Sequence, residues 1–216
     1  MTTRLVVFVV LVTAVLAGCG TTAPSSVSRG PSLSAVVLKA SQVGSGYRLK
    51  MRRDSHCVQR CVTLDLCGFH FQSEAVRTTR LQVNYVKNPK ALGLSNEVVR
   101  YQSGGSAFAI QELKRAVATC PHHPVESAVA GVPPLTYRIH RFTASQLLTG
   151  AVALRITVSG TARGRPVTIT GVVIYQVSGT LLSGVYVTVS AGSNLAAALH
   201  FAVHAARASA TNLEHG

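Results

Sequence analysis

The C-terminal half of the chain contains four apolar-rich segments, and the last three are separated only by short turns that contain glycine. In "LTYRIHR" apolar and polar residues alternate, which is typical of a strand with one buried face. Turns as short as Ala162–Gly164 and Ser178–Gly179 can join only antiparallel neighbours. Any fold for this chain must therefore accommodate an antiparallel meander. We predict its four strands within residues 133–144, 150–162, 165–179 and 180–192.

The rest of the chain supplies three helical patterns and three further strands. "RLQVNYV" places Leu81, Val83 and Tyr85 on one face of a strand, whereas the helical segments repeat apolar residues every three to four positions. Antiparallel strands with segregated helices indicate the α+β class. We expect one central, mostly antiparallel twisted sheet of about six to seven strands, with helices packed on it and disulfides stapling it. The predicted helices cover residues 32–44, 106–121 and 193–213, and the predicted strands cover 46–54, 80–86 and 95–103.

Small polar residues and glycine mark the ends of these helices. Ser32, Ser106 and Ser193 each precede a helical pattern, and a serine hydroxyl can accept from the free N–H groups at a helix start. Gly44 follows the first pattern, where a glycine commonly ends a helix. The cysteine-rich stretch 55–70 has no apolar period and is predicted to be a loop.

Composition excludes a disordered chain and points to anionic partners. Of 216 residues, 47% are hydrophobic and 13% charged, which is enough apolar material for a sizeable core. The formal net charge is +14, from 21 Lys plus Arg against 7 Asp plus Glu. Such a surplus attracts anionic lipid, wall polymers or nucleic acid. The cations form no dense run and no aromatic-interleaved strand, so we expect no nucleic-acid partner.

The N-terminus has the organisation of an export signal. Residues 1–18 contain Arg4 and a short apolar run, "LVVFVVLVTAVLA", which falls below the roughly 20 residues of a membrane span. Leu16-Ala17-Gly18-Cys19 resembles the lipobox of bacterial lipoproteins, which implies cleavage before Cys19 and attachment of a diacylglyceryl group and palmitate to that residue. The alternative is an uncleaved helix with a buried cysteine.

This reading places the protein at the cell membrane, lipid-anchored on the extracytoplasmic face. Residues 19–32 are small, polar and rich in Ser, Gly and Pro, which is typical of a flexible tether. A single domain, residues 33–213, would follow the tether. The membrane is thus one expected partner, through the diacylglyceryl anchor.

Without Cys19, four cysteines remain, and an even number in an exported protein favours two disulfides. We favour Cys67–Cys120 with a local Cys57–Cys61 bridge; the rival pairing crosses Cys57–Cys67 with Cys61–Cys120. Zinc is the other use of such cysteines. Their Cys-x3-Cys-x5-Cys spacing does not match a compact zinc motif, so no metal site is predicted.

Residues that could perform catalysis are sparse. The sequence has no GxSxG elbow, no HExxH helix and no phosphate-binding glycine loop, so no catalytic residue and no cofactor is predicted. The pairs His122–His123 and His200–His204 are interpreted as surface residues. The remaining cluster, formed by Ser73, Glu74, Arg77 and Arg80, is interpreted as a structural ion pair.

Several stretches together resemble a known family. "TLDLCG", "SEAVRTTRLQVNY" and "SNEVVRYQSGGSAFAIQELKRAVATCP" are similar to actinobacterial sensor-domain lipoproteins of the PknH-like extracellular domain family. That family is related to the extracellular sensor domain of a mycobacterial receptor serine/threonine kinase. The resemblance covers roughly residues 33–212. It implies a non-catalytic domain with a central antiparallel sheet, disulfides and a cleft for an unknown ligand. This chain resembles the sensor half alone, without a kinase domain.

Two functions follow as expectations, and neither is enzymatic. The first is a lipid-anchored, extracytoplasmic, sensor-like module that binds a small molecule, a wall fragment or a protein in a cleft of the sheet. The alternative is a carrier of lipid or glycolipid, with an apolar cavity between sheet and helices. A secreted hydrolase would need a spatial cluster of nucleophile, histidine and carboxylate. The sequence identifies no ligand-binding residue.

Overall fold

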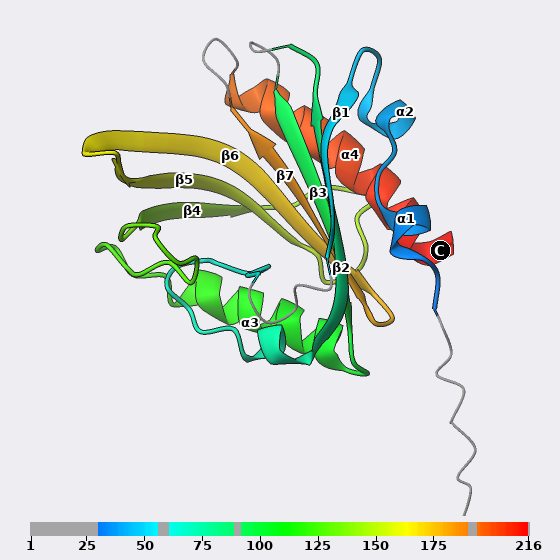
Figure 1. Cartoon of the computed structure of the whole chain (residues 1–216), viewed down its shortest axis with the longest axis horizontal. Coiled ribbons are helices and arrows are strands. Elements are labelled where there is room, and N and C mark those ends of the chain that lie inside the picture. The colour runs from blue at the N-terminus through cyan, green and yellow to red at the C-terminus, as the bar shows by residue number, and fades with distance from the viewer. Residues whose placement is uncertain (1–29, 56–60, 89–91, 190–193, 216) are drawn as a thin grey trace, which may run out of the picture.

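The computed structural model describes residues 30–55, 61–88, 92–189 and 194–215. Cys19, Cys57, the predicted signal peptide and nearly all of the predicted tether lie outside these ranges. The described chain forms one seven-stranded sheet with helices on both faces (Figure 1). Its strands are β1 (Arg48–Ser55), β2 (Arg77–Val86), β3 (Gly93–Tyr101), β4 (Thr136–Phe142), β5 (Val152–Ala162), β6 (Arg165–Ser178) and β7 (Leu181–Thr188).

The sheet confirms the predicted α+β class. Its strand order is β1-β2-β3-β7-β6-β5-β4, and every neighbouring pair is antiparallel. The predicted meander is thus present, and its last strand, β7, inserts beside β3 to join the two halves. The β5–β6 turn uses Arg163 and Gly164, both with positive φ, and positive φ at both central residues suits a two-residue hairpin.

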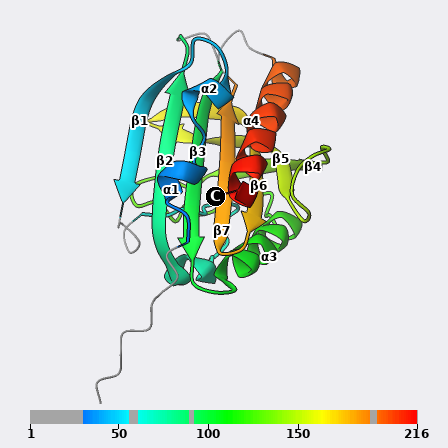
Figure 2. The ribbon, with the colours of Figure 1, turned by 90° about the vertical axis from the view of Figure 1, so that its right-hand side faces the viewer.

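One face of the sheet, the α4 side, is covered by α4 (Leu195–His215) and two short helices, α1 (Leu33–Val36) and α2 (Ala40–Val43) (Figure 2). Small residues allow α4 to lie close to the strands, and its buried positions are mostly alanine. Asn194 Oδ1 accepts from the N–H of Ala197 at the start of α4. The predicted cap, Ser193, lies outside the described residues. No helix in the described ranges is both long and apolar enough to cross a membrane.

The helix predicted over residues 32–44 is instead two helices, which corrects the sequence-based expectation. Ser32 caps the first helix and Gly44 ends the second, as predicted. Between them, Leu38 donates its N–H to Asn96 Oδ1 at 2.9 Å and accepts from the hydroxyl of Tyr85 at 2.8 Å. Because both backbone groups of Leu38 bond to the sheet, they are lost to the helix, and the helix breaks there.

The other face, the α3 side, is covered by α3 (Gly105–Ala118) and by the segment 61–76, which includes the short 3₁₀ helix η1 (Gln72–Val76). Ile110 and Leu113 are buried on α3, as their spacing predicts. The predicted cap was wrong: α3 begins after Gly104, and Ser106 is buried inside the helix. Its hydroxyl donates to the carbonyl of Gly179 at 2.6 Å, so this serine ties α3 to the β6–β7 turn.

A disulfide joins Cys67 to Cys120, just beyond the end of α3, with a Cα–Cα distance of 5.1 Å. This confirms one predicted bridge and excludes the rival pairing, which used both cysteines differently. Cys61 is disulfide-bonded as well. Its expected partner, Cys57, lies outside the described residues, so that pairing stays a prediction.

Asn96 provides a test of how the α4 side is assembled. Besides Leu38, its side chain bonds Ser183 Oγ at 2.9 Å and the carbonyl of Gly184 at 3.0 Å, and the residue is fully buried. We expect Asn96→Ala to lower the free energy of unfolding by about 2–4 kcal/mol, because buried partners lose their hydrogen bonds. Urea denaturation measures this change. The control, Asn84→Ala on a half-exposed position, is expected to cost under about 1 kcal/mol; equal losses would contradict the prediction.

Candidate functional site

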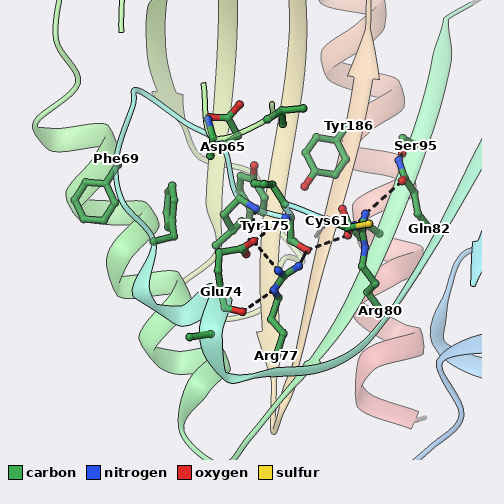
Figure 3. Close-up of a pocket in the computed structure, with 18 of the residues that line it drawn as sticks. Cys61, Asp65, Phe69, Glu74, Arg77, Arg80, Gln82, Ser95, Tyr175 and Tyr186 are labelled. Atoms are coloured by element: carbon green, nitrogen blue, oxygen red, sulfur yellow. Dashed lines mark hydrogen bonds and ion pairs between the residues drawn. The ribbon is translucent and has the colours of Figure 1, made fainter. Parts of the chain in front are cut away.

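A pocket of about 1160 Å³ opens on the α3 side (Figure 3). Three parts of the chain form it: the segment 61–75, the loop at residues 128–130, and side chains from the central strands. From β2 and β3 come Arg77, Arg80, Gln82, Ser95 and Glu97, and from β6 and β7 come Tyr175 and Tyr186. The pocket therefore has a sheet for a floor and irregular segments for walls.

Segment 61–71 has no regular secondary structure, yet several contacts fix its course. The N–H of Phe69 bonds the carbonyl of Leu66 at 3.0 Å, and both residues between them, Cys67 and Gly68, have positive φ. At Gly68 a Cβ would come within 2.8 Å of Val125, so the tight approach requires glycine. The Cys67–Cys120 disulfide then holds this turn beside the end of α3.

A buried carboxylate on α3 fixes the next part of the wall. Glu112 is 2% exposed and accepts from the backbone N–H groups of Gln72 and Ser73, at 2.9 and 3.0 Å. These are free N–H groups at the start of η1, where a negative charge is favourable. Glu112 thus locks η1 onto α3.

Glu74, in η1, holds the beginning of segment 61–71. Its two oxygens accept from the backbone N–H groups of Thr63, at 2.9 Å, and Leu64, at 3.3 Å. The same carboxylate pairs with Arg77 at 3.0 Å. Arg77 in turn donates to the hydroxyl of Thr63 at 2.7 Å. Thr63 is therefore held through both its backbone and its side chain.

Glu97 completes the cluster from the middle of the sheet. It lies in β3, opposite Gln82 on β2 and Gly184 on β7, and is 5% exposed. Its carboxylate pairs with Arg80 at 2.6 Å and accepts from the Thr63 hydroxyl at 3.1 Å. We call Thr63, Glu74, Arg77, Arg80 and Glu97 the ionic floor. Two carboxylates from different elements thus meet at one threonine.

Burial controls the titration of the ionic floor. Desolvation raises the pKa of Glu97 to about 7, although Arg80 and the Thr63 hydroxyl act in the opposite direction. Desolvation also raises the pKa of Glu74, opposed by the Thr63 N–H and by Arg77. In both groups burial penalises the charged form more than the partners compensate. Glu97 therefore changes charge near neutral pH.

Two tyrosines lie beside the ionic floor. Tyr175 and Tyr186 stand edge to face, with ring centroids 5.7 Å apart, and their hydroxyls are hydrogen-bonded to each other. A Cβ on Gly184 would come within 2.6 Å of the Tyr186 hydroxyl, so only glycine leaves room for this ring over β7. Burial raises the pKa of both phenols, which keeps them neutral. They offer polar groups without charge.

One cation of the pocket stands apart from these pairs. Arg53, on β1, lines the pocket and is exposed, and it has no ion-pair partner in the described part of the chain. Arg77 and Arg80, in contrast, are both paired with glutamates. His70, on segment 61–71, also lines the pocket and is exposed. Asp65 also lines the pocket without an ion-pair partner among the described residues, and it accepts from the hydroxyl of Ser127. The pocket therefore has one unpaired cation and one unpaired carboxylate besides its paired floor.

The structure brings together most of the predicted cluster. Glu74, Arg77 and Arg80 join the ionic floor, and Glu74–Arg77 is the ion pair that the sequence suggested. Ser73 is buried beside Glu112 instead, and its hydroxyl has no hydrogen-bond partner among the described residues. Sequence reasoning missed Glu97 as a site residue. The one signal for it in the sequence is a charged residue in the middle of a strand, where a buried position is common.

The two histidine pairs lie away from this site. His122 and His123 are exposed in the loop after α3, and His200 and His204 are exposed on α4. The latter two line a small groove of about 330 Å³ with Arg207. Among the described residues no three His, Cys, Asp or Glu side chains gather as a metal site would require.

The charge state of Glu97 generates a prediction about pH. Its pKa is about 7 in the folded protein and near 4.5 when exposed, so the folded state binds a proton more tightly. Stability therefore falls as the pH rises from about 4.5 to 7, by about 3 kcal/mol for this group. We expect Glu97→Gln, which cannot ionise, to flatten the dependence of the melting temperature on pH across that window. A slope equal to that of the wild type would contradict this assignment.

Comparison with known proteins identifies the fold. No protein-family model and no curated protein matches the sequence. Among solved structures, the chain is similar to the extracellular domain of PknH from Mycobacterium tuberculosis, with a TM-score of 0.50 and 11% sequence identity. The match covers 82% of this chain and 93% of that domain. At this identity the likeness is one of fold alone.

Proposed function

We propose that this chain is a non-catalytic, extracytoplasmic, sensor-like domain that binds a ligand in the pocket over the ionic floor. The observation that carries the proposal is the pocket itself: about 1160 Å³, walled by a segment without regular structure that a disulfide and three glutamates, two of them buried, hold in place. A pocket fixed in this way is preformed for binding.

The contacts of the ionic floor favour a binding role over catalysis. Glu74 and Glu97 are each engaged by an arginine and by Thr63. The histidine pairs lie elsewhere, on the loop after α3 and on α4. What the pocket offers is a set of fixed hydrogen-bonding groups, including the phenols of Tyr175 and Tyr186.

The lipid-carrier alternative receives less support. Apolar side chains pack α4 directly on one face of the sheet and α3 on the other. The large pocket instead places four ionisable side chains and two tyrosines at its floor. A cavity that encloses hydrocarbon would be lined almost wholly by apolar groups. The pocket therefore suits a ligand with a polar part.

The proposed location rests on three observations. A disulfide between Cys67 and Cys120 is typical of oxidising compartments outside the cytoplasm. The fold is similar to the extracellular domain of PknH. The sequence around Cys19 matches a lipobox, and we propose that a diacylglyceryl group on this cysteine holds the domain at the extracytoplasmic face of the cell membrane.

The anchor is tested by Cys19→Ser. We expect the wild-type chain to sediment with membranes and to carry a lipid-sized mass on Cys19, because the sulfur is the attachment atom. The variant is expected to lose that mass and to leave the membrane fraction. Fractionation of the native host, with mass spectrometry of the N-terminal peptide, measures both. An unmodified Cys19 in the wild type would overturn the anchor.

Ligand binding is tested by filling the pocket without touching the ionic floor. Ala128 lines the pocket and is exposed, so Ala128→Trp adds volume inside it while its backbone contact to Asp65 remains. We expect native mass spectrometry to detect a bound small molecule after the wild type is incubated with a cell-envelope extract. The variant is expected to lose at least about 90% of that signal, since a tenfold loss of affinity needs only 1.4 kcal/mol.

Ala107→Trp is the matched control, because Ala107 is exposed on α3 and does not line the pocket. It is expected to bind like the wild type. If Ala128→Trp and Ala107→Trp retain the molecule equally, or if the wild type retains none, the pocket is not the binding site.

A further inference from the structure

The charge balance of the chain changes after Glu126. Between Glu126 and Glu214 the sequence contains no aspartate and no glutamate, but it contains six arginines and three histidines. This stretch includes β4, β5, β6, β7 and most of α4. None of its arginines forms an ion pair with a described residue, because both described ion pairs belong to the ionic floor. This part of the domain is therefore basic and has no counter-charge of its own.

The strand register gathers part of this charge on the α4 side of the sheet. His140 on β4 lies opposite Arg155 on β5, and Arg138 lies diagonally across from Arg155. Leu154 and Ile156, on either side of Arg155, are buried in the core on the α3 side, so Arg155 projects from the α4 side. Residues that pair across strands share a face, at Cβ distances of roughly 5 Å when directly opposite and 7–8 Å along a diagonal. Three basic side chains thus lie together.

Arg155 is half-buried, yet no carboxylate of the described chain neutralises it. Its Nε atom is buried and has no hydrogen-bond partner among the described residues. A partly buried cation beside a second cation is unfavourable for folding. An unsatisfied group of this kind needs an explanation, and an anion from outside the domain supplies one.

Hydroxyl groups extend the same face along the β5–β6 hairpin. Thr157 lies opposite Thr170 with hydroxyl oxygens 3.3 Å apart, and Ser159 lies opposite Thr168 with oxygens 3.0 Å apart. Thr157 and Ser159 follow Arg155 at even spacing on β5, so they project from the same side. Hydroxyls can donate hydrogen bonds to anionic oxygens. The α4 side of the hairpin therefore offers cations and neutral donors without a carboxylate.

The groove beside α4 contains the remaining basic side chains of this face. Phe142 follows His140 by two residues on β4, so it lies on the same side, and it lines the groove of about 330 Å³ with His200, His204 and Arg207. The guanidinium of Arg207 donates only to neutral oxygens of the loop after β4. We define the basic face by six residues: Arg138, His140, Arg155, His200, His204 and Arg207.

The shape of the basic face favours a ligand that is long and narrow. From Arg138 to Phe142 the strand extends roughly 13 Å, and the groove continues from Phe142 between α4 and residues 143–144. A single phosphate group is too small to contact both ends. A flat membrane surface would not reach the half-buried Arg155 and the interior of the groove together. A polymer chain can follow both.

We propose that the basic face binds a linear polyanion, a polymer with repeated phosphate groups, at a site separate from the pocket. Arginine and hydroxyl groups recognise phosphate oxygens through hydrogen bonds that the charges strengthen. The pocket opens on the α3 side, whereas the basic face lies on the α4 side, so both sites can be occupied at once. The inference does not depend on the proposed pocket ligand.

Titration of the purified full chain with inorganic polyphosphate, followed by calorimetry at physiological ionic strength, tests the site. We expect Arg138→Glu to weaken binding at least about tenfold, which corresponds to 1.4 kcal/mol or more. Arg141→Glu is the matched control, because Arg141 is exposed on the same strand but lies opposite Leu154, whose side chain packs on the α3 side. It changes the net charge equally and is expected to weaken binding less than about threefold, since salt screens distant charges. Equal weakening by both variants would mean diffuse attraction and would refute the site.

Arg155→Gln tests the half-buried cation. We expect this variant to weaken polyphosphate about tenfold without lowering the melting temperature, because the Nε atom of Arg155 has no described partner to lose. A cation that served only the fold would give the reverse result. Unchanged binding of polyphosphate would contradict the role of Arg155, whatever happens to the melting temperature.

Three further probes identify the kind of anion. Inorganic phosphate is expected to bind at least about tenfold more weakly than polyphosphate at equal phosphate concentration, because linked groups bind together; equal binding would indicate a site for one anion and refute the polymer. Phosphatidylglycerol vesicles that bind as tightly as polyphosphate, and that also depend on Arg138, would make the face a membrane surface instead. A single-stranded oligonucleotide that binds more tightly than polyphosphate of equal length would show that bases contribute, which also refutes the proposal.

The pocket variant separates this inference from the proposed function. Ala128→Trp is expected to bind polyphosphate like the wild type, because Ala128 lines the pocket on the opposite side of the sheet. If Ala128→Trp loses polyphosphate, the polyanion enters the pocket and the basic face is refuted. If the wild type retains no envelope-derived molecule in the pocket but binds polyphosphate through Arg138, the proposed function fails and this inference stands.

Discussion

Thr63 is the point on which the site depends. Its N–H bonds Glu74, and its hydroxyl lies between Arg77 and Glu97, so one small residue connects a 3₁₀ helix, a strand and an irregular segment. Segment 61–71 cannot fix its own path, because its backbone forms few bonds of its own. In the strands, backbone N–H groups bond the neighbouring strand; in this segment, side-chain carboxylates accept from the backbone N–H groups instead. The pocket wall exists because this junction holds.

The buried ion pairs of the ionic floor are not an efficient way to stabilise a protein. Burial raises the pKa of Glu97 to about 7, which means that the surroundings disfavour its ionised form despite the neighbouring Arg80. Buried ion pairs commonly contribute less than well-packed apolar side chains of the same size. An ionic floor beneath an open pocket is easier to understand as a requirement of binding than as a requirement of folding.

Much of the fold could be predicted from the sequence, because its strands alternate and its turns are short. "RLQVNYV" and the meander occupy the predicted places, and Ile110 and Leu113 are buried on the predicted helix. The first helix could not be predicted correctly, since its break at Leu38 depends on Asn96, 58 residues away. The spacing of apolar residues within one segment does not indicate a hydrogen-bond partner so far away in the sequence.

The candidate site could be predicted only in part, for the same physical reason. Glu74 and Arg77 are near in sequence, so their ion pair was accessible to sequence reasoning. Glu97 belongs to the site because β3 pairs with β2 in one register, which places it beside Arg80.

The start of the described chain has a consequence for geometry at a membrane. Arg100, at the end of β3, donates to the carbonyl of Pro31, so the polypeptide leaves the domain at a fixed point. If Cys19 carries the lipid, only the residues between it and Gly30 separate that point from the bilayer. At about 3.5 Å per residue these span at most about 40 Å, roughly one bilayer thickness. The point where the chain leaves the domain would then stay within about 40 Å of the membrane surface. This distance limits how far from the membrane the domain can bind a ligand.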